Sequence, residues 1–479
     1  MKQTTNRRTE RVVWSAVTVA LASLVLILVL APPAFAQGRS AEQSDTEAAL
    51  EVFENVFRFV QENYVEEIDP EVLLEGALSG LFESLEDPYS MYLDAAAIRG
   101  LTDTTTGEFG GVGMYIAKER PENEEEGSGY VEVVAPIEDT PAFRAGMRAG
   151  DLIIGVRDFE EEEFTSTSEL TIDEAVDMLR GTPGSKVVIR VRRGERAEFN
   201  VTLERAIIQV PTARYAMIDG DIGYLRIIQF TPQTVAAVTE AVEFFEANEY
   251  RSMIVDVRTN PGGRLDSVID VADLFLEGGT IVGTASRIPM ENDRFTAESE
   301  TIVDEDTPVA VLINEGSASA AEILAGALQD RNRAYLIGET TFGKGSVQQI
   351  RRVADGGFRL TMSRYYLPSG RFIDKVGVDP DLEVIPPQLS DEESEIYAEL
   401  LNSERIIDWV EENLDPTERE IEQFVDSLQS GEFDLPDRWI EIAISDEVNR
   451  QNNVQQVYDL EHDVVLQTAV ELLEDGELP

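Results

Sequence analysis

A serine and a lysine stand in two short segments of small residues, and together they could hydrolyse an amide bond. Ser319 lies in the run SASA, and Lys344 lies between two glycines in the sequence TFGKG. A serine hydroxyl becomes a useful nucleophile when a base removes its proton, and a lysine can be that base only while it is neutral. Burial or a nearby cation can lower the pKa of a lysine towards roughly 7–8, and the glycines and Phe342 favour such an environment. The pattern predicts a Ser–Lys dyad, but a small-residue helix start beside an unrelated basic turn would show the same local sequence.

Attack on a carbonyl also requires amide donors for the oxyanion, and the chain offers two. The serine follows an apolar strand expected over residues 309–313 and opens a helix, so the N–H of Ala320 is one natural donor. A second apolar strand, MIVDVR, runs into the turn PGG, where the N–H of Gly263 can be the other. We therefore expect Gly263 and Ala320 to form an oxyanion hole where core strands end, a common position for sites in α/β folds.

The rarity of two residue types excludes several other chemistries. The chain has no cysteine, which excludes thiol catalysis, disulfides and a lipid anchor on cysteine, and its single histidine is His462, near the C-terminus. A zinc site of the usual type needs several histidine or cysteine ligands, and a Ser-His-Asp triad would have to recruit His462 alone. We therefore expect no metal and no other cofactor.

The lysine segment allows one competing interpretation. Residues 338–344 match the first part of a phosphate-binding P-loop, in which the next position is a serine or threonine that binds magnesium. Gly345 occupies that position, so the hydroxyl is missing. The dyad is therefore favoured over a nucleotide site.

Charge and the N-terminal sequence indicate an exported protein. The chain carries 93 acidic against 39 basic residues, a net charge of −54, which repels nucleic acid and is typical of a surface adapted to high salt. Basic residues precede an apolar run over residues 12–30 and the sequence Ala34-Phe35-Ala36, as in a secretory signal. We expect a signal peptide at 1–36 and a periplasmic or other extracytoplasmic location. The alternative is an uncleaved anchor, in which residues 12–30 tether the protein to a membrane.

Changes in periodicity divide the rest of the chain into four regions, which predict a multidomain α/β protein. These are a helical N-terminal region at 37–104, a region of short strands at 105–205, an α/β core at 206–387 that carries the dyad, and an acidic helical region at 388–479.

Local signals mark some of the boundaries. The polar residues 37–48 are expected to form a flexible lead-in to a helix that starts at Ala49. Asp69-Pro70 is expected to begin a second helix, and the capping box of Thr171 and Glu174 a third.

The order of the motifs resembles that of the carboxy-terminal processing proteases, also called tail-specific proteases, over most of the chain after the signal. The motifs are LEDPYS, FGGVG, TPAFRAGMRAGDLIIGV, IGYLRIIQF, DVRTNPGG, NEGSASAAEILAGALQD, GETTFGKGSVQQ, YYLPSG and GVDPD. Several ordered motifs are much more specific than any one of them.

The resemblance implies a crotonase-like ββα protease core with an inserted PDZ domain at 105–205. It implies that Ser319 is the nucleophile, that Lys344 is the general base, and that Gln348 orients the lysine by a hydrogen bond. It also implies an oxyanion hole at Gly263 and Ala320, which agrees with the local argument.

Two neighbouring residues bear on this assignment. Ser317 is the rival nucleophile, but the family pattern places the reactive serine second in SASA, which is Ser319. The family often has a serine where this chain has Ala321, which weakens any supporting role for a third hydroxyl and leaves the dyad intact.

For the short-strand region, the resemblance implies that Gly110, Gly111, Val112 and Gly113 present amides to the C-terminal carboxylate of a substrate, whose tail adds as a strand. A glycine-rich hairpin with no ligand is the plain alternative. The implied activity is that of an exported serine endopeptidase that cleaves unfolded or tail-marked proteins near their C-termini. The alternative function is a catalytically inactive PDZ scaffold that binds protein C-termini, and a homodimer through the helical terminal regions is a further expectation.

Overall fold

The computed structural model describes residues 37–479, apart from 119–128, 138, 195–196, 299, 354–355, 404, 430–432, 453, 455, 477 and 479. The chain forms two compact units, of which the first ends at Glu86 and the second begins at Asp87. The expected signal peptide, with its alternative as a membrane tether, lies outside the described residues. Within the described part, no helix has both the length and the apolar character needed to cross a membrane.

The first unit contains two described helices, α2 (Gln37–Asn63) and α3 (Pro70–Glu83). The expected flexible lead-in at 37–48 is wrong, because α2 begins at Gln37; alanine, glutamate and glutamine favour helix and extend the amphipathic turns that follow. The expected start of α3 is confirmed, since the Asp69 side chain accepts the N–H of Glu71 and Pro70 occupies the first turn. Several apolar side chains of α2 are exposed, namely Leu50, Val52, Phe53, Val56 and Phe59.

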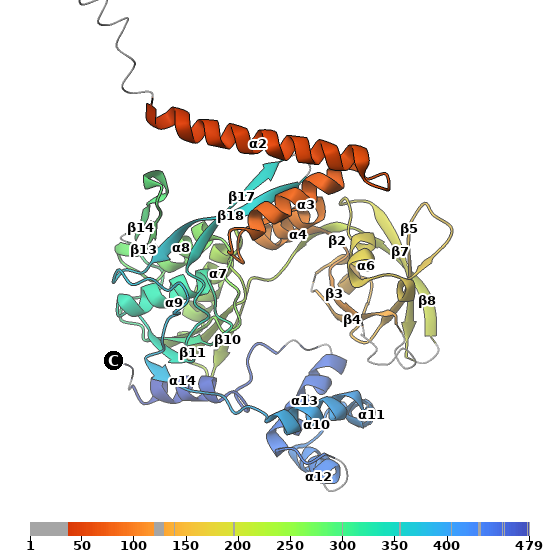
Figure 1. Ribbon diagram of the computed structural model, residues 1–479. Helices are drawn as coiled ribbons and strands as arrows, with labels where there is room; N and C mark the ends of the chain where they lie inside the picture. The colour runs from red at the N-terminus through yellow and green to blue at the C-terminus, as the bar shows by residue number, and fades with distance from the viewer. Residues whose placement is uncertain are drawn as a thin grey trace, which may run out of the picture. The chain divides into compact units, whose positions relative to one another are not determined.

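The second unit contains a six-stranded sheet, of which Figure 1 labels β10 and β11. Its order is β10 (Ala213–Ile218), β11 (Ile222–Ile227), β12 (Ser252–Asp256), β15 (Val309–Ile313), β16 (Tyr335–Gly338) and β19 (Leu382–Glu383). All neighbouring pairs are parallel except β10 with β11. Parallel sheets require cover on both faces, which explains why β12 and β15 are buried along their whole length.

Helices cover the two faces of this sheet. Val255 and Val311 pack with α7 (Thr234–Ala247), α8 (Leu265–Asp273) and α9 (Ala320–Asp330). On the other face, Ile254 and Leu312 pack with α14 (Val464–Glu474), near the end of the chain. Successive side chains along each strand therefore pack into two separate apolar cores, one on each face of the sheet.

A buried ion cluster attaches the last helix to the core. Arg258 donates to Asp256, at the end of β12, and to Asp463, whose carboxylate also caps α14. The guanidinium is the main group that offsets the burial of Asp256 and keeps its pKa below the usual value. This cluster lies immediately before the turn expected to carry the oxyanion hole.

A second sheet carries the hairpin that follows the lysine. It contains β1 (Met91–Leu93), β18 (Gly356–Tyr366), β13 (Gly279–Ala285) and β14 (Arg294–Ala297), with β17 (Ser346–Val353) paired to β18. Because β17 starts just after Lys344, this hairpin determines which side chains surround the lysine. The helix α4 (Ala95–Thr106) packs on β18.

The short-strand region is a module with its own apolar core. Its sheet contains β3 (Met114–Lys118), β4 (Val131–Pro136), β5 (Leu152–Asp158), β7 (Lys186–Arg193) and β8 (Ala197–Glu204), with β6 (Thr165–Ser166) beside β5; its helices are α5 (Pro141–Arg144) and α6 (Ile172–Leu179). The predicted capping box of Thr171 and Glu174 is confirmed at the start of α6. The chain enters through β2 (Glu108–Gly111) and leaves through β9 (Ala206–Gln209), which pair with each other. This pairing is the arrangement expected of an inserted module.

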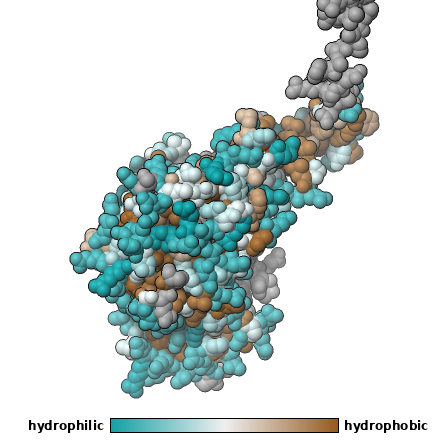
Figure 2. Space-filling view, turned by 90° about the vertical axis from the view of Figure 1, so that its left-hand side faces the viewer, coloured by the Kyte–Doolittle hydropathy of each residue, from teal (hydrophilic) through white to brown (hydrophobic). Residues whose placement is uncertain are grey.

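Beyond the core the chain is helical, as predicted. The helices are α10 (Asp391–Asn402), α11 (Arg405–Glu412), α12 (Glu418–Gln429) and α13 (Asp437–Gln451), which share a small apolar core. Trp409 stacks on Phe424 within it, with the ring centroids 4.4 Å apart. The face drawn in Figure 2 is mostly hydrophilic, in keeping with the strongly acidic sequence. The prediction of a multidomain α/β fold is confirmed.

Candidate active site

Ser319 stands at the turn between β15 and α9 in a strained backbone conformation. Its φ is 57° and its ψ is −112°, a combination that costs of order 1–3 kcal/mol for a residue with a side chain. The turn faces a cavity of about 760 Å³. All five residues predicted for the catalytic centre line this cavity, namely Ser319, Lys344, Gln348, Gly263 and Ala320. The fold brings them together, and their roles stay predictions.

The strained turn is held by Glu322, which the sequence analysis did not identify. Its carboxylate is fully buried and accepts four hydrogen bonds. One oxygen accepts the N–H groups of Ser319 and Lys344, both at 2.8 Å. The other accepts the N–H of Gly343 at 2.7 Å and the hydroxyl of Thr341 at 2.6 Å. Glu322 thus connects the serine turn directly to the lysine loop. A glutamate three residues after a helix-starting serine has capping-box spacing, and that signal could have found it.

Ser317 has a structural role. Its side chain is completely buried, and its hydroxyl donates to the carbonyl of Val257 at 2.8 Å and accepts the N–H of Asn314 at 3.1 Å. It does not line the cavity. The geometry therefore favours Ser319 over its neighbour as the nucleophile.

The two expected oxyanion donors have free N–H groups. Among the described residues, the backbone amides of Gly263 and Ala320 form no hydrogen bond. Asn260 shapes the glycine turn, since its side chain accepts the N–H of Gly262 and donates to the carbonyl of Ile227, both at 2.8 Å.

Position 263 requires glycine. Its φ is 145°, and a Cβ there would lie 2.1 Å from the carbonyl oxygen of Phe230. The backbone on both sides is fixed, because Phe230 accepts from Arg264 at 2.9 Å and donates to Gly262 at 3.0 Å. The amide of Gly263 is thereby held at the cavity.

Lys344 lies in surroundings that favour its neutral form. Its Nζ is 5.2 Å from the centroid of the Tyr89 ring, a contact that by itself favours the ammonium, but burial and charge outweigh it. Burial lowers the pKa of Lys344, the nearby Arg359 guanidinium lowers it further, and the Glu322 carboxylate opposes both. The neutral base is therefore more abundant at a given pH than for a lysine in water.

The expected hydrogen bond from Gln348 to Lys344 is not formed among the described residues. The side-chain amide of Gln348 donates to the hydroxyl of Ser346 at 2.8 Å. A register shift in the β17–β18 hairpin falls opposite this position, between Val347 and Gln348, and Met362 of β18 is the extra residue. Gln348 still lines the same cavity as the lysine.

His462 belongs to another part of the fold. Its Nδ1 lies 3.1 Å from the carboxylate of Asp459, and the residue does not line the cavity. The described residues also contain no group of acidic or histidine side chains suited to a metal ion.

Comparison with known proteins places this geometry in a family. The profile of peptidase family S41 matches residues 221–384, which contain both members of the predicted dyad. A carboxy-terminal-processing protease of Bartonella bacilliformis is 40% identical over 351 residues, which cover 72% of this chain and 77% of that protein. The chain belongs to the carboxy-terminal-processing proteases of family S41. It is a serine-type peptidase, as predicted.

Other matches extend the likeness beyond the protease core. The profile described as the activating protease CtpB N-terminal domain matches residues 32–97. The carboxy-terminal processing protease CtpA of Bacillus subtilis is 30% identical over 372 residues, 78% of this chain and 76% of that protein. Among solved structures, the photosystem II D1 C-terminal processing protease is 27% identical with a TM-score of 0.42, over 70% of this chain and 92% of that chain.

The inserted module of this carboxy-terminal-processing protease contains a groove between α6 and the edge strand β3, which we call the α6–β3 groove. It has a volume of about 260 Å³, and its walls include Gly111, Val112, Gly113, Val176 and Leu179. Within the described sheet β3 pairs only with β4, so its other edge is open to a further strand.

The four predicted loop residues have different positions at this groove. Gly111, Val112 and Gly113 line it, whereas Gly110 does not. A Cβ on Gly110 would lie 2.3 Å from the carbonyl oxygen of Gly181, so that glycine packs against the loop after α6. Gly113 has φ of 80°, and its carbonyl accepts the hydroxyl of Thr140 at 2.8 Å.

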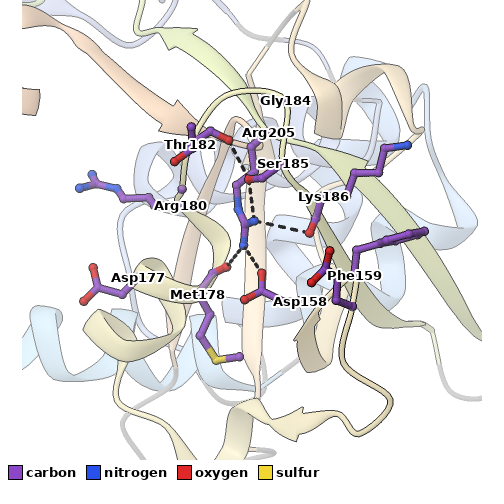
Figure 3. Close-up of a pocket in the computed structure, with 12 residues that line it drawn as sticks. Asp158, Phe159, Asp177, Met178, Arg180, Thr182, Gly184, Ser185, Lys186 and Arg205 are labelled. Carbon is purple, nitrogen blue, oxygen red and sulfur yellow. Dashed lines mark hydrogen bonds and ion pairs between the residues drawn. The ribbon is translucent and has the colours of Figure 1, made fainter.

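Arg205 binds the C-terminal end of α6 (Figure 3). Its guanidinium donates to the carbonyl of Met178 at 2.7 Å and to the Asp158 carboxylate at 3.0 Å. It also donates to the carbonyl of Leu179 at 3.2 Å. These bonds satisfy carbonyls left open at the helix C-terminus. A cavity of about 760 Å³ lies at this end of the helix, and the Arg205 guanidinium on its wall is bonded to protein groups. The α6 wall of the groove is thereby anchored to the module's sheet.

Proposed function

We propose that this protease cleaves protein substrates near their C-termini with Ser319 as nucleophile and Lys344 as general base. One observation carries the proposal: a single cavity is lined by both residues and by Gly263 and Ala320, whose N–H groups form no hydrogen bond among the described residues.

In this mechanism neutral Lys344 accepts the hydroxyl proton of Ser319, and Oγ attacks the substrate carbonyl. The amides of Gly263 and Ala320 stabilise the oxyanion. The Lys344 ammonium then protonates the leaving amine, and water hydrolyses the acyl-enzyme. For the first step Nζ must move from the face of Tyr89 to Ser319, and Gln348 in the same cavity is the amide available to orient it there.

We further propose that residues 105–205 act as a PDZ domain that recruits substrates. The open edge of β3 can accept a substrate tail as an added strand, and the amides of Gly111, Val112 and Gly113, which line the groove, can receive its terminal carboxylate. Around this module we propose three further regions. They are a helical N-terminal region at 37–104, an α/β protease core at 206–387 and an acidic helical region at 388–479.

Export, membrane attachment and self-association belong to the same proposal. The sequence of residues 1–36 supports a signal peptide with a tether through residues 12–30 as its alternative, and the exposed apolar face of α2 supports a homodimer. Sequencing the N-terminus of protein purified from the producing cell distinguishes cleavage from anchoring. Light scattering of the mature protein measures the number of copies.

The catalytic assignment is tested by cleavage of casein and of a tagged peptide in high salt. We expect Ser319→Ala and Lys344→Ala each to lower kcat/KM by roughly 10⁴-fold or more, as for other residues of a catalytic unit. His462→Ala, outside the cavity, should leave cleavage unchanged. Full cleavage by both dyad variants would refute the assignment. A wild-type protein that binds the tagged peptide and never cuts it would instead support the inactive scaffold.

A further inference from the structure

We propose that Tyr365 is a further catalytic residue, which holds the hydroxyl of Ser319 at rest and then stabilises the negative charge that develops on its Oγ. The inference rests on the proposed role of Ser319 as the nucleophile. It concerns a residue that no motif of the sequence analysis singled out for chemistry.

Tyr365 is buried at the end of β18, and it lines the cavity of the dyad. Its hydroxyl lies 2.9 Å from Ser319 Oγ and 2.8 Å from the carbonyl oxygen of Lys344. Its backbone N–H donates to the carbonyl of Gly345 at 2.9 Å. Both ends of the residue are therefore bound to the lysine loop, which fixes the phenol oxygen relative to the serine.

The position of the single phenol proton follows from its two neighbours. Burial raises the pKa of Tyr365 far above its ordinary value, so the hydroxyl stays protonated wherever the enzyme works. A carbonyl oxygen can only accept a hydrogen bond, whereas a serine hydroxyl can donate or accept. All three groups are satisfied when Tyr365 donates to Lys344 and Ser319 donates to Tyr365.

Activation of the serine reverses the second of these bonds. When Lys344 takes the serine proton, Ser319 has no proton to donate, and its Oγ becomes an anionic acceptor 2.9 Å from the phenol. The phenol O–H can then turn from the Lys344 carbonyl to Oγ, and a hydrogen bond to a charged acceptor is stronger than one to a neutral carbonyl. No proton leaves Tyr365: the serine proton goes to Nζ, and the Oγ electron pair forms the bond to the substrate carbon.

The next residue in the chain provides a matched control. Tyr366 points to the other face of β18, where its ring packs against Phe372 with centroids 5.9 Å apart. It does not line the cavity. Removing its hydroxyl changes the same chemical group at the neighbouring position without touching Ser319.

The test compares Tyr365→Phe with Tyr366→Phe in the full-length enzyme. We expect Tyr365→Phe to lower kcat by about 10–100-fold at unchanged KM, somewhat less than the loss of an oxyanion-hole donor. The rate at which a fluorophosphonate labels Ser319 should fall by a similar factor. Tyr366→Phe should change neither rate by more than about two-fold.

Both rates are divided by the amount of enzyme that the fluorophosphonate labels at saturation. An unfolded fraction of the variant therefore does not lower either rate. Wild-type kcat and labelling in Tyr365→Phe would overturn the proposal. Loss of kcat with a normal labelling rate would also overturn it, because Ser319 would then be equally nucleophilic without the phenol. If wild type is labelled at Ser319 and Ser319→Ala cannot cleave, the nucleophile assignment stands even when the Tyr365 proposal fails.

Discussion

The serine turn and the α6–β3 groove are held in place by different means. A buried carboxylate with four hydrogen bonds fixes the serine turn, and beside it two backbone amides, proposed to form the oxyanion hole, have no hydrogen bond among the described residues. The groove has a glycine loop held by the hydroxyl of Thr140 and a helix held by Arg205, and one edge of β3 is unpaired among the described strands. Catalysis requires every polar group to be aligned before the reaction, whereas a tail-binding edge must leave backbone groups for the ligand to complete.

The difference also appears in the energetics. Burial of a carboxylate is costly, and Glu322 is tolerated because each oxygen receives two donors. The strain at Ser319 persists because those donors come from both the serine turn and the lysine loop. No comparable buried carboxylate lines the α6–β3 groove. Changes at the serine turn should therefore be more damaging than changes at the groove.

Among the changes that compare the two regions, the largest effect is expected from Glu322→Gln, which replaces one acceptor oxygen with a donor facing N–H groups. We expect kcat/KM to fall by about 10²–10³-fold, because serine and lysine lose their shared support, and the unfolding temperature to fall by several degrees. Glu315→Gln, an exposed acid of the same turn, is the control and should be neutral. Activity and thermal unfolding measure both. Equal behaviour of the two variants would show that the serine turn does not depend on its buried carboxylate.

An intermediate effect is expected from Arg359→Gln. Loss of the guanidinium removes a cation that lowers the pKa of Lys344, so the pKa of the lysine rises and less of it is neutral at a given pH. The ascending limb of kcat/KM against pH should move to higher pH, with a several-fold loss at neutral pH that disappears in alkali. Arg359→Lys retains the charge and should keep the wild-type profile. An unmoved limb in the glutamine variant would contradict this electrostatic role.

The smallest effect is expected at the groove. Val176→Glu places an acid against the expected terminal carboxylate and should raise KM for a tail-bearing substrate several-fold, with kcat unchanged. Asp177→Asn, next to it but on the cavity at the far end of α6, is the control. A short peptide without a tail should be cut equally by all three proteins. A fall in kcat rather than a rise in KM would show that the groove is coupled to the serine turn.

Most of the fold was predictable from the sequence because it depends on local patterns. A continuous apolar run predicted β15 with its observed bounds, and capping residues predicted the starts of α3 and α6. The prediction of a flexible segment at 37–48 was wrong. It relied on the low apolar content of these residues and neglected their alanine, glutamate and glutamine, which favour helix.

For the site, the sequence by itself determined the chemistry. The lack of cysteine excluded a thiol nucleophile, and a single histidine is too few for a zinc site of the usual type. The small-residue segments around Ser319 and Lys344 predicted a Ser–Lys dyad, and the fold brings both residues to one cavity. The glycine turn after β12 also predicted a backbone amide near the serine, and Gly263 lines the same cavity as Ser319.

Only the tertiary structure decided which groups surround the dyad. Tyr365 reaches Ser319 because β18 returns beside the lysine loop, and the Gln348 side chain donates a hydrogen bond to Ser346. In the sequence Glu322 looks like any acidic residue in the first turn of a helix. Only the structure shows that it is buried and accepts four hydrogen bonds. Such contacts join residues far apart in the chain, so they depend on strand pairing and packing, which leave little trace in the residues next to each position.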